Sequence, residues 1–253
     1  MLGFLYSVFA YTAFLAVFCA LAVFTDGLFL PKHVDTGAPQ GFGWALAVNL
    51  GLLLGWGVQH SVMARQGFKD WLTRFIPVHL ERATYVLASS LALAGLMLGW
   101  QPMAGQVWQV EATPAVVLLW GLNALGWVCV PVASFLIDHF DLFGLKQAFQ
   151  HWRRGSYQSR GFVMPWLYRY VRHPMMTALL VGFWATPFMT VSHLCLSLGM
   201  SLYIVIGVHF EERSLRRELG ADYAVYQSQV PKFIPRVGGA PRGTAAETST
   251  ARS

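Results

Sequence analysis

Charged and aromatic residues lie on both sides of a long apolar run in the C-terminal half of the chain. Residues 168–174 read YRYVRHP before this run, and Glu211 and Glu212 follow it. The run, 175–209, is too long for one membrane span and is interrupted by proline and polar residues near its centre, which predicts a hairpin of two short helices joined by a tight turn. Because a hairpin returns the chain to the face it left, we expect Arg172 and His173 to lie near the two glutamates.

Two interpretations of this charged cluster are open. A salt-bridged collar at the membrane surface would bring the same charges together and would contribute little stability. A collar does not account for the sequence VPKFIP at 230–235 or for the surrounding tyrosines. We therefore interpret YRYVRHP at 168–174 as half of a functional site, whose other half the hairpin brings back to it. The tyrosines are Tyr168, Tyr170, Tyr223 and Tyr226.

Two further polar segments lie at the borders of apolar runs. His60 lies in GVQHSVMAR, residues 57–65, and Arg82 and Tyr85 lie in HLERATY, residues 79–85. Such groups are costly in hydrocarbon unless they face a cavity or hydrogen-bond partners. A role in catalysis and a role in inter-helix hydrogen bonding or at the membrane interface are therefore alternatives.

A third polar segment, DHFDLFGLKQAF at 138–149, mixes two acids with large apolar residues, which predicts a helix lying along the membrane surface. Asp138, His139 and Asp141 do not predict a metal site, because adjacent residues point in different directions and no further ligand set is evident.

The composition identifies the class of protein. The chain of 253 residues is 55% hydrophobic and 12% charged, whereas soluble domains have about a quarter of their residues charged. Four windows are long enough to span a membrane: about 4–24, 43–63, 84–103 and 115–137. We expect an all-α polytopic integral membrane protein with four single spans, a C-terminal helical hairpin and interfacial helices. The first window lacks a basic n-region, which favours a retained helix over a signal peptide.

The distribution of cations predicts the orientation. With these spans, 17 of the 18 Lys and Arg residues fall on one face, and Lys32 lies on the other. The positive-inside rule then places both termini and the long loops in the cytoplasm. We expect the membrane to be a bacterial inner membrane. The net charge of +6 is explained by this topology and by lipid headgroups, so we expect the lipid bilayer, and no nucleic acid, as a partner.

Cysteine usage and the chain end add two expectations. The three cysteines lie inside the expected spans without C-x-x-C spacing, so neither disulfides nor a zinc site is predicted. Residues 237–253 are small and polar without periodicity, which predicts a disordered tail after a single domain, 1–236. The oligomeric state does not follow from the sequence.

Taken together, these motifs resemble a known superfamily. The last third of the chain resembles the isoprenylcysteine carboxyl methyltransferase and phospholipid methyltransferase superfamily. The resemblance rests on RHP at 172–174, EE-x-x-L from Glu211 and the pattern G-x-x-Y-x-x-Y-x-x-x-VP-x-FIP, which ends at Pro235. The phrases QHSVMAR, ERATYVL, FDLFGLKQ and YRYVRHPMM are similar to the methanethiol S-methyltransferase branch over most of 44–236. Met176 stands where isoprenylcysteine enzymes carry tyrosine, which favours that branch.

The resemblance implies the cofactor S-adenosylmethionine, bound mainly by residues 138–236. Arg172 or His173 would meet its carboxylate. Glu211 or Glu212 would accept hydrogen bonds from its ribose hydroxyls and ammonium, and an aromatic face would stabilise its sulfonium. The resemblance therefore predicts a cofactor site formed by Gln147, Tyr168, Arg172, His173, Glu211 and Glu212.

The resemblance also implies the reaction, in which the thiolate of methanethiol takes the methyl group and dimethyl sulfide forms. An alkyl thiol is a weaker acid than cysteine, whose pKa is about 8.5, so a base or a positive field would help. His60 is the candidate base, oriented by Asp141, with Tyr85 and Arg82 nearby. Tyr85 and Asp141 are therefore predicted as catalytic partners of His60, and Arg82 as a substrate-binding residue.

Three alternatives remain open. A methyltransferase could act on a larger acceptor, such as a prenylated cysteine or a lipid amine. An NADPH-dependent reductase would share the architecture of sterol reductases. A non-enzymatic membrane assembly protein would leave the charged cluster as a collar.

Overall fold

A computed structural model describes residues 1–157 and 166–236, and these residues form an all-α protein. Five helices are long and apolar enough to cross a membrane. They are α1 (Leu2–Asp26), α2 (Phe42–Met63), α4 (Glu81–Gly99), α5 (Thr113–Ile137) and α9 (Val191–Gln229). The four windows predicted as single spans coincide with α1, α2, α4 and α5, although α4 ends at Gly99 rather than at residue 103.

The predicted hairpin is confirmed, but its second helix is not short. The first helix, α8, is Pro174–Trp184, and α9 then continues for 39 residues, far beyond the end of the apolar run. Glu, Arg and Leu, which dominate residues 211–219, are good helix formers, so α9 continues after the apolar residues end. The helix bends at Gly220, whose φ of 58° and ψ of −128° suit glycine.

Short elements connect the long helices. At the end of the molecule that contains the N-terminus lie α3 (Gln66–Leu72), η1 (Val78–Leu80), α6 (His139–Leu142) and α7 (Leu145–Trp152). A further turn of 3-10 helix, η2 (Trp166–Arg169), precedes α8. The predicted surface helix over 138–149 is thus two short helices, separated by Gly144 in a left-handed conformation.

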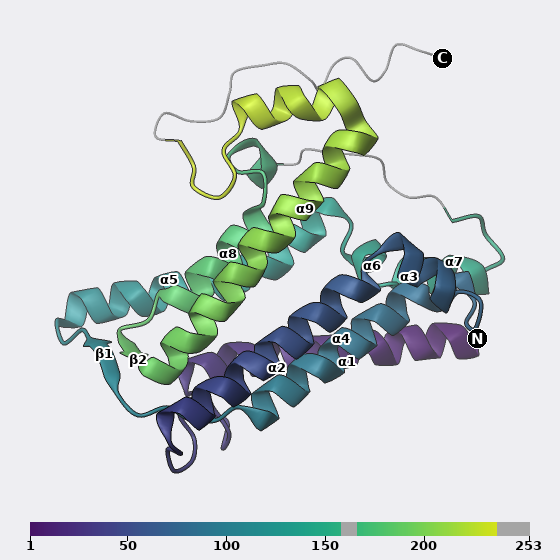
Figure 1. The fold of residues 1–253 in the computed structure, drawn as a ribbon. Coiled ribbons are helices and arrows are strands. Elements are labelled where there is room, and N and C mark those ends of the chain that lie inside the picture. Colours follow the sequence, from purple (N-terminus) through teal and green to yellow (C-terminus); the bar gives the residue numbers. More distant parts are fainter. Residues whose placement is uncertain (158–165, 237–253) are drawn as a thin grey trace.

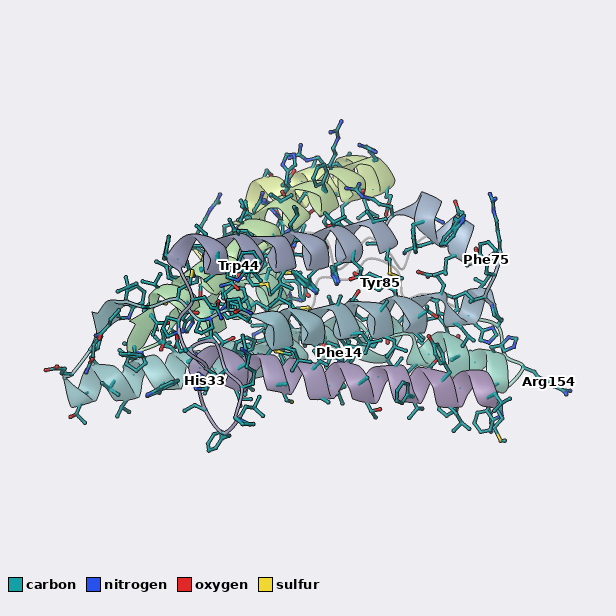
Figure 2. The ribbon with its side chains drawn as sticks, turned by 60° about the horizontal axis from the view of Figure 1, so that its bottom comes forward. Phe14, His33, Trp44, Phe75, Tyr85 and Arg154 are labelled. Carbon is teal, nitrogen blue, oxygen red and sulfur yellow. The ribbon has the colours of Figure 1, made fainter. Side chains whose placement is uncertain are left out.

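The helices form two groups. One contains α1, α4 and α2, the other contains α5, α8 and α9, and α2 packs against α9 where the groups meet. Figure 2 shows Tyr85 and Phe14 among the helices, with Phe75 and Arg154 at one end of the molecule and His33 at the other. Many large apolar side chains point outward, such as Leu54, Leu98 and Val117, so the outer surface suits a lipid environment.

The loops on the face that carries Lys32 are tied together by hydrogen bonds. Strands β1 (Gln106–Gln109) and β2 (Phe188–Thr190) pair antiparallel, and the Lys32 ammonium donates to the carbonyl of Trp100. The Asn49 side chain donates to the carbonyl of Gln101 and accepts from its amide. Trp100 is fully buried, and its Nε1 donates to the hydroxyl of Ser192 at the start of α9.

Glycine permits the close packing of α5 on α8. A Cβ atom on Gly126 would lie 2.6 Å from the backbone nitrogen of Gly182, a distance that no rotamer change relieves. We expect Gly126→Ala to cost about 1–3 kcal/mol through overpacking, which corresponds to a fall in melting temperature of about 2–12 °C. Thermal unfolding in detergent measures this. Gly121→Ala, on the same helix with nothing within 4 Å of the new Cβ, is the control and should not lower the melting temperature.

Candidate active site

A cavity of about 360 Å³ lies between the two helix groups. Its wall is largely apolar, and its volume falls in the range of small-molecule sites. Ionisable side chains line it from four helices: His60 from α2, Arg82 and Tyr85 from α4, His139 from α6 and Tyr203 from α9. We call this cavity the chamber.

His60 lines this chamber and has one ring nitrogen without a hydrogen-bond partner among the described residues. Its Nε2 is 2.8 Å from the hydroxyl of Tyr85, and its ring stacks on Trp56 with the centroids 5.3 Å apart. The other nitrogen, Nδ1, is buried and has no hydrogen-bond partner among the described residues. A buried nitrogen without a partner carries a desolvation cost that a bound polar group would relieve, so His60 is well placed to meet a ligand.

The predicted partners of His60 differ in where they lie. Tyr85 bonds to it, as expected, and Arg82 lines the same chamber without a hydrogen bond or ion pair in the described part of the chain. Asp141 makes no hydrogen bond to His60 within residues 1–157 and 166–236. Its backbone bonds to Asp138 and Gln147, and its Oδ1 is buried without a partner.

His139 is a chamber residue that sequence reasoning missed as a site residue. Its Nδ1 lies 2.6 Å from the hydroxyl of Ser134, and its Nε2 lies 2.7 Å from the hydroxyl of Tyr11. Because the Ser134 hydroxyl donates to the carbonyl of Pro131, its oxygen accepts from Nδ1–H, and Tyr11 donates to Nε2. Burial lowers the pKa of His139, which agrees with a neutral ring. No sequence signal joins these residues, because Tyr11 is 128 positions away.

The charged cluster predicted at the hairpin ends is present. Arg172 Nε is 2.8 Å from Glu212 Oε1, and His173 Nε2 is 3.2 Å from the same oxygen. His173 Nδ1 is 3.6 Å from Glu211 Oε2. The four residues therefore come together as the hairpin topology predicts.

Within this cluster the two glutamates have different surroundings. Glu212 is buried and also accepts from Lys232 at 3.2 Å and from the Gln227 amide at 3.1 Å. The Glu211 side chain is 52% exposed and has His173 as its one salt-bridge partner in the described residues. Glu212 is thus occupied by the protein's own donors, whereas the Glu211 carboxylate can accept from a ligand.

Arg172 holds the C-terminal segment in place. Its Nη1 donates to the carbonyls of Gln227 and Val230, and its backbone amide donates to the carbonyl of Pro231. The next amide, that of His173, donates to the carbonyl of Lys232. These bonds explain why RHP and VPKFIP occur together, since one segment is the hydrogen-bond partner of the other.

The tyrosines extend the cluster. The bend at Gly220 lets the end of α9 fold back, so that Tyr223 and Tyr226 form a small buried core with Val230. The Tyr226 hydroxyl donates to the carbonyl of Tyr168. Burial, and secondarily the charge of Glu211, raise the pKa of Tyr168. Tyr168 therefore lies close to the exposed carboxylate and stays uncharged.

Gln147 lies apart from this cluster. It belongs to α7, which packs on α1, α6 and η1, and its amide nitrogen donates to the carbonyl of Asp141. Its Oε1 is buried without a partner, and among the described residues Gln147 has no hydrogen bond to the charged cluster. In the same described ranges no three His, Cys, Asp or Glu side chains form a group that could hold a metal ion.

The chamber and the charged cluster share two helices. Met175 and Met176 line the chamber and follow directly after His173 and Pro174 on α8. On α9, Ile204 lines the chamber, and Glu211 lies seven residues further, about 10 Å along the helix axis. A ligand bound at the cluster could therefore extend one end into the chamber.

The fold and site define a helical membrane protein in which an apolar chamber adjoins a charged site. No protein-family model and no solved structure matches the chain. It is 43% identical over 233 residues to methanethiol S-methyltransferase 2 of Bradyrhizobium diazoefficiens, covering 92% of this chain and 90% of that protein. It is 44% identical to methanethiol S-methyltransferase of Mycobacterium tuberculosis, with 91% and 95% covered. The enzyme of that name from a Pseudomonas strain is 45% identical, with 92% and 90% covered.

The chain therefore belongs to the methanethiol S-methyltransferase family, whose members are methyltransferases. The predicted family, the all-α membrane fold and the predicted enzyme class are confirmed.

Proposed function

We propose that this protein transfers a methyl group from S-adenosylmethionine to methanethiol and releases dimethyl sulfide. The observation that carries this proposal is the position of His60, which lines an apolar chamber next to the charged cluster and has one ring nitrogen without a partner among the described residues. The names of the relatives agree with this substrate.

The groups around Glu211 suit the proposed cofactor. S-adenosylmethionine has a carboxylate, an ammonium, ribose hydroxyls and a sulfonium, so it needs cationic, anionic and aromatic partners. The half-exposed Glu211 carboxylate would accept from the ammonium or the ribose, and His173 would meet the carboxylate. Tyr168 would present its ring to the sulfonium. Arg172 and Glu212 would support these residues, because their charged groups bond to one another and to the C-terminal segment.

When bound, the cofactor supplies an electrophilic methyl group on a sulfonium. The residues of the chain then have to position the acceptor and remove its proton. His60 Nδ1 takes the proton of the thiol, and Tyr85 orients the ring through Nε2. The guanidinium of Arg82 stabilises the thiolate from the same wall of the chamber. His139, with both nitrogens occupied, shapes the opposite wall.

The chamber volume supports a small acceptor over a prenylated one. At about 30 Å³ per non-hydrogen atom, the share of a water molecule in the liquid, 360 Å³ holds about twelve such atoms. A prenylated cysteine has more atoms than this in its prenyl chain alone.

We also propose one catalytic domain over 1–236 with both termini in the cytoplasm, where a charged cofactor reaches the cluster.

Headspace gas chromatography tests the proposed function. Purified protein in nanodiscs receives methanethiol and S-adenosylmethionine, and we expect dimethyl sulfide from the wild type and from Glu218→Gln, an exposed control on α9. Glu211→Gln should raise the KM for the cofactor about tenfold, the loss of one charge-assisted hydrogen bond.

Two outcomes would contradict the proposal. Cofactor binding without dimethyl sulfide would retain a methyltransferase but exclude methanethiol. Absence of cofactor binding would favour the reductase or the assembly protein.

A further inference from the structure

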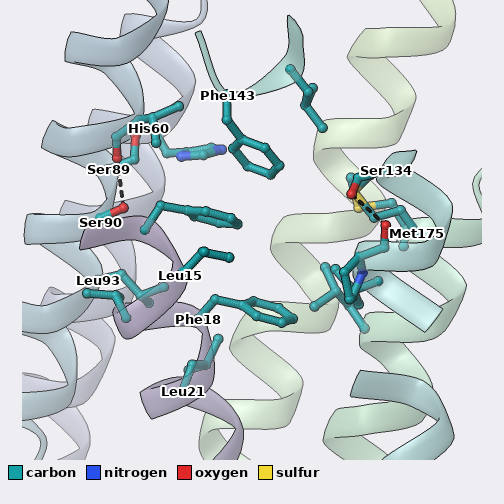
Figure 3. A pocket seen from close by; sticks show the side chains of 18 of the residues that line it. Leu15, Phe18, Leu21, His60, Ser89, Ser90, Leu93, Ser134, Phe143 and Met175 are labelled. Carbon is teal, nitrogen blue, oxygen red and sulfur yellow. Dashed lines mark hydrogen bonds between the residues drawn. The ribbon is translucent and has the colours of Figure 1, made fainter. Parts of the chain in front are cut away.

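The chamber has two chemically different ends. His60, Arg82 and Tyr85 line one end, whereas Leu21, Leu93 and Phe183 line the other. Figure 3 shows this separation, with His60 beside Phe143 at one end and Leu93 and Leu21 at the other. An acceptor with a polar head and an apolar tail would match this distribution.

The chamber is also larger than methanethiol requires. Its volume corresponds to about twelve non-hydrogen atoms, whereas methanethiol and the transferred methyl group need three. Along α8 the lining residues run from Met175 to Phe183, eight residues or about 12 Å. Most of the chamber would therefore stay empty around methanethiol.

Water is a poor occupant of the remaining space. A buried water needs two to four polar partners, and the Leu21, Leu93 and Phe183 side chains offer none. Leaving the space empty forfeits dispersion contacts of the lining side chains. An alkyl chain would supply those contacts.

We propose that the site also methylates linear alkanethiols of up to about eight carbons, with the thiol at His60 and the alkyl chain between Leu21, Leu93 and Phe183. This inference rests on the proposed function. The S–H bond of the thiol breaks and its proton goes to His60 Nδ1. The sulfur then forms a bond to the methyl carbon, while the sulfonium–methyl bond breaks and leaves its electron pair on the donor sulfur.

The chain length of the thiol should set its KM. Burying one CH₂ contributes about 0.8 kcal/mol, which converts to about a fourfold lower KM for each carbon added between methanethiol and hexanethiol. Dodecanethiol with the transferred methyl has fourteen non-hydrogen atoms, more than the chamber holds, so we expect its KM to fall no further than that of octanethiol.

Substitutions at Leu93 test where the alkyl chain lies. Each thiol is assayed at a known free aqueous concentration, and the methyl sulfide product is measured by gas chromatography–mass spectrometry. Leu93→Trp, which fills the apolar end, should lower the ratio of kcat/KM for hexanethiol to that for methanethiol about tenfold or more. Leu93→Ala should extend the range to longer chains. Leu91→Trp, a similar change at an exposed position on the same helix, should leave the ratio unchanged.

The outcomes separate the two proposals. Turnover of methanethiol without hexanethiol would overturn the alkyl-chain site and keep the proposed function. A hexanethiol-to-methanethiol ratio of kcat/KM that Leu93→Trp leaves unchanged would also overturn the alkyl-chain site. If the protein methylates no thiol, the proposed function itself is wrong.

Discussion

Replacing His60 by alanine should lower kcat for methanethiol methylation about 10²–10⁴-fold, the size of a lost general base. His60 lines the chamber, and its buried Nδ1 has no partner in the described part of the chain. Because the residue lies away from the charged cluster, S-adenosylmethionine should bind the variant with wild-type affinity. Initial rates by headspace chromatography and cofactor binding by calorimetry measure the two quantities.

The pH dependence of the methylation rate shows whether His60 acts as a base or only packs in the chamber wall. Without His60 the enzyme would depend on thiolate from solution, whose concentration rises tenfold per pH unit below the thiol pKa. The rate of His60→Ala should therefore rise steeply between pH 6 and 9, while the wild-type rate rises less. His209→Ala, at an exposed position on α9, is the matched control. A His60→Ala enzyme with the wild-type rate at mildly acidic pH would exclude His60 as the base.

Replacing Glu212 by alanine should destabilise the protein strongly. The change leaves the Arg172 guanidinium, whose side chain is only 9% exposed, without its carboxylate. Breaking a buried ion pair in this way costs about 3–5 kcal/mol, which lowers the melting temperature by about 6–20 °C. Tryptophan fluorescence during thermal unfolding measures this, since the chain has ten Trp residues.

The neighbouring glutamate supplies the comparison. Glu211→Ala removes a half-exposed carboxylate with a weak contact to His173, so the melting temperature should change by less than about 2 °C. Its effect should fall on the cofactor KM instead. If both variants lowered the melting temperature equally, the division between a supporting Glu212 and a ligand-binding Glu211 would be wrong.

The sequence by itself determined which segments form spans, and that the two ends of the C-terminal hairpin lie close together. In lipid every backbone polar group must be satisfied within its own helix, so an apolar run of sufficient length is decisive, as for α1, α2 and α5. The pairing of Arg172 with the two glutamates followed from connectivity, since a helical hairpin returns the chain to its starting face. The length of α9 did not follow, because hydropathy marks where a helix leaves the lipid rather than where it ends.

Only the tertiary structure decided which side chains meet inside the bundle. Adjacent residues on a helix point about 100° apart, so the rotation of α9 about its axis decides that Glu212 is buried and Glu211 is not. The His60–Tyr85 and His139–Tyr11 contacts join different helices and depend on the rotation of both. Asp141 lies on α6 and makes no hydrogen bond to His60 within the described residues. Helix formation is a local property of the sequence, whereas the chamber is formed by contacts between helices.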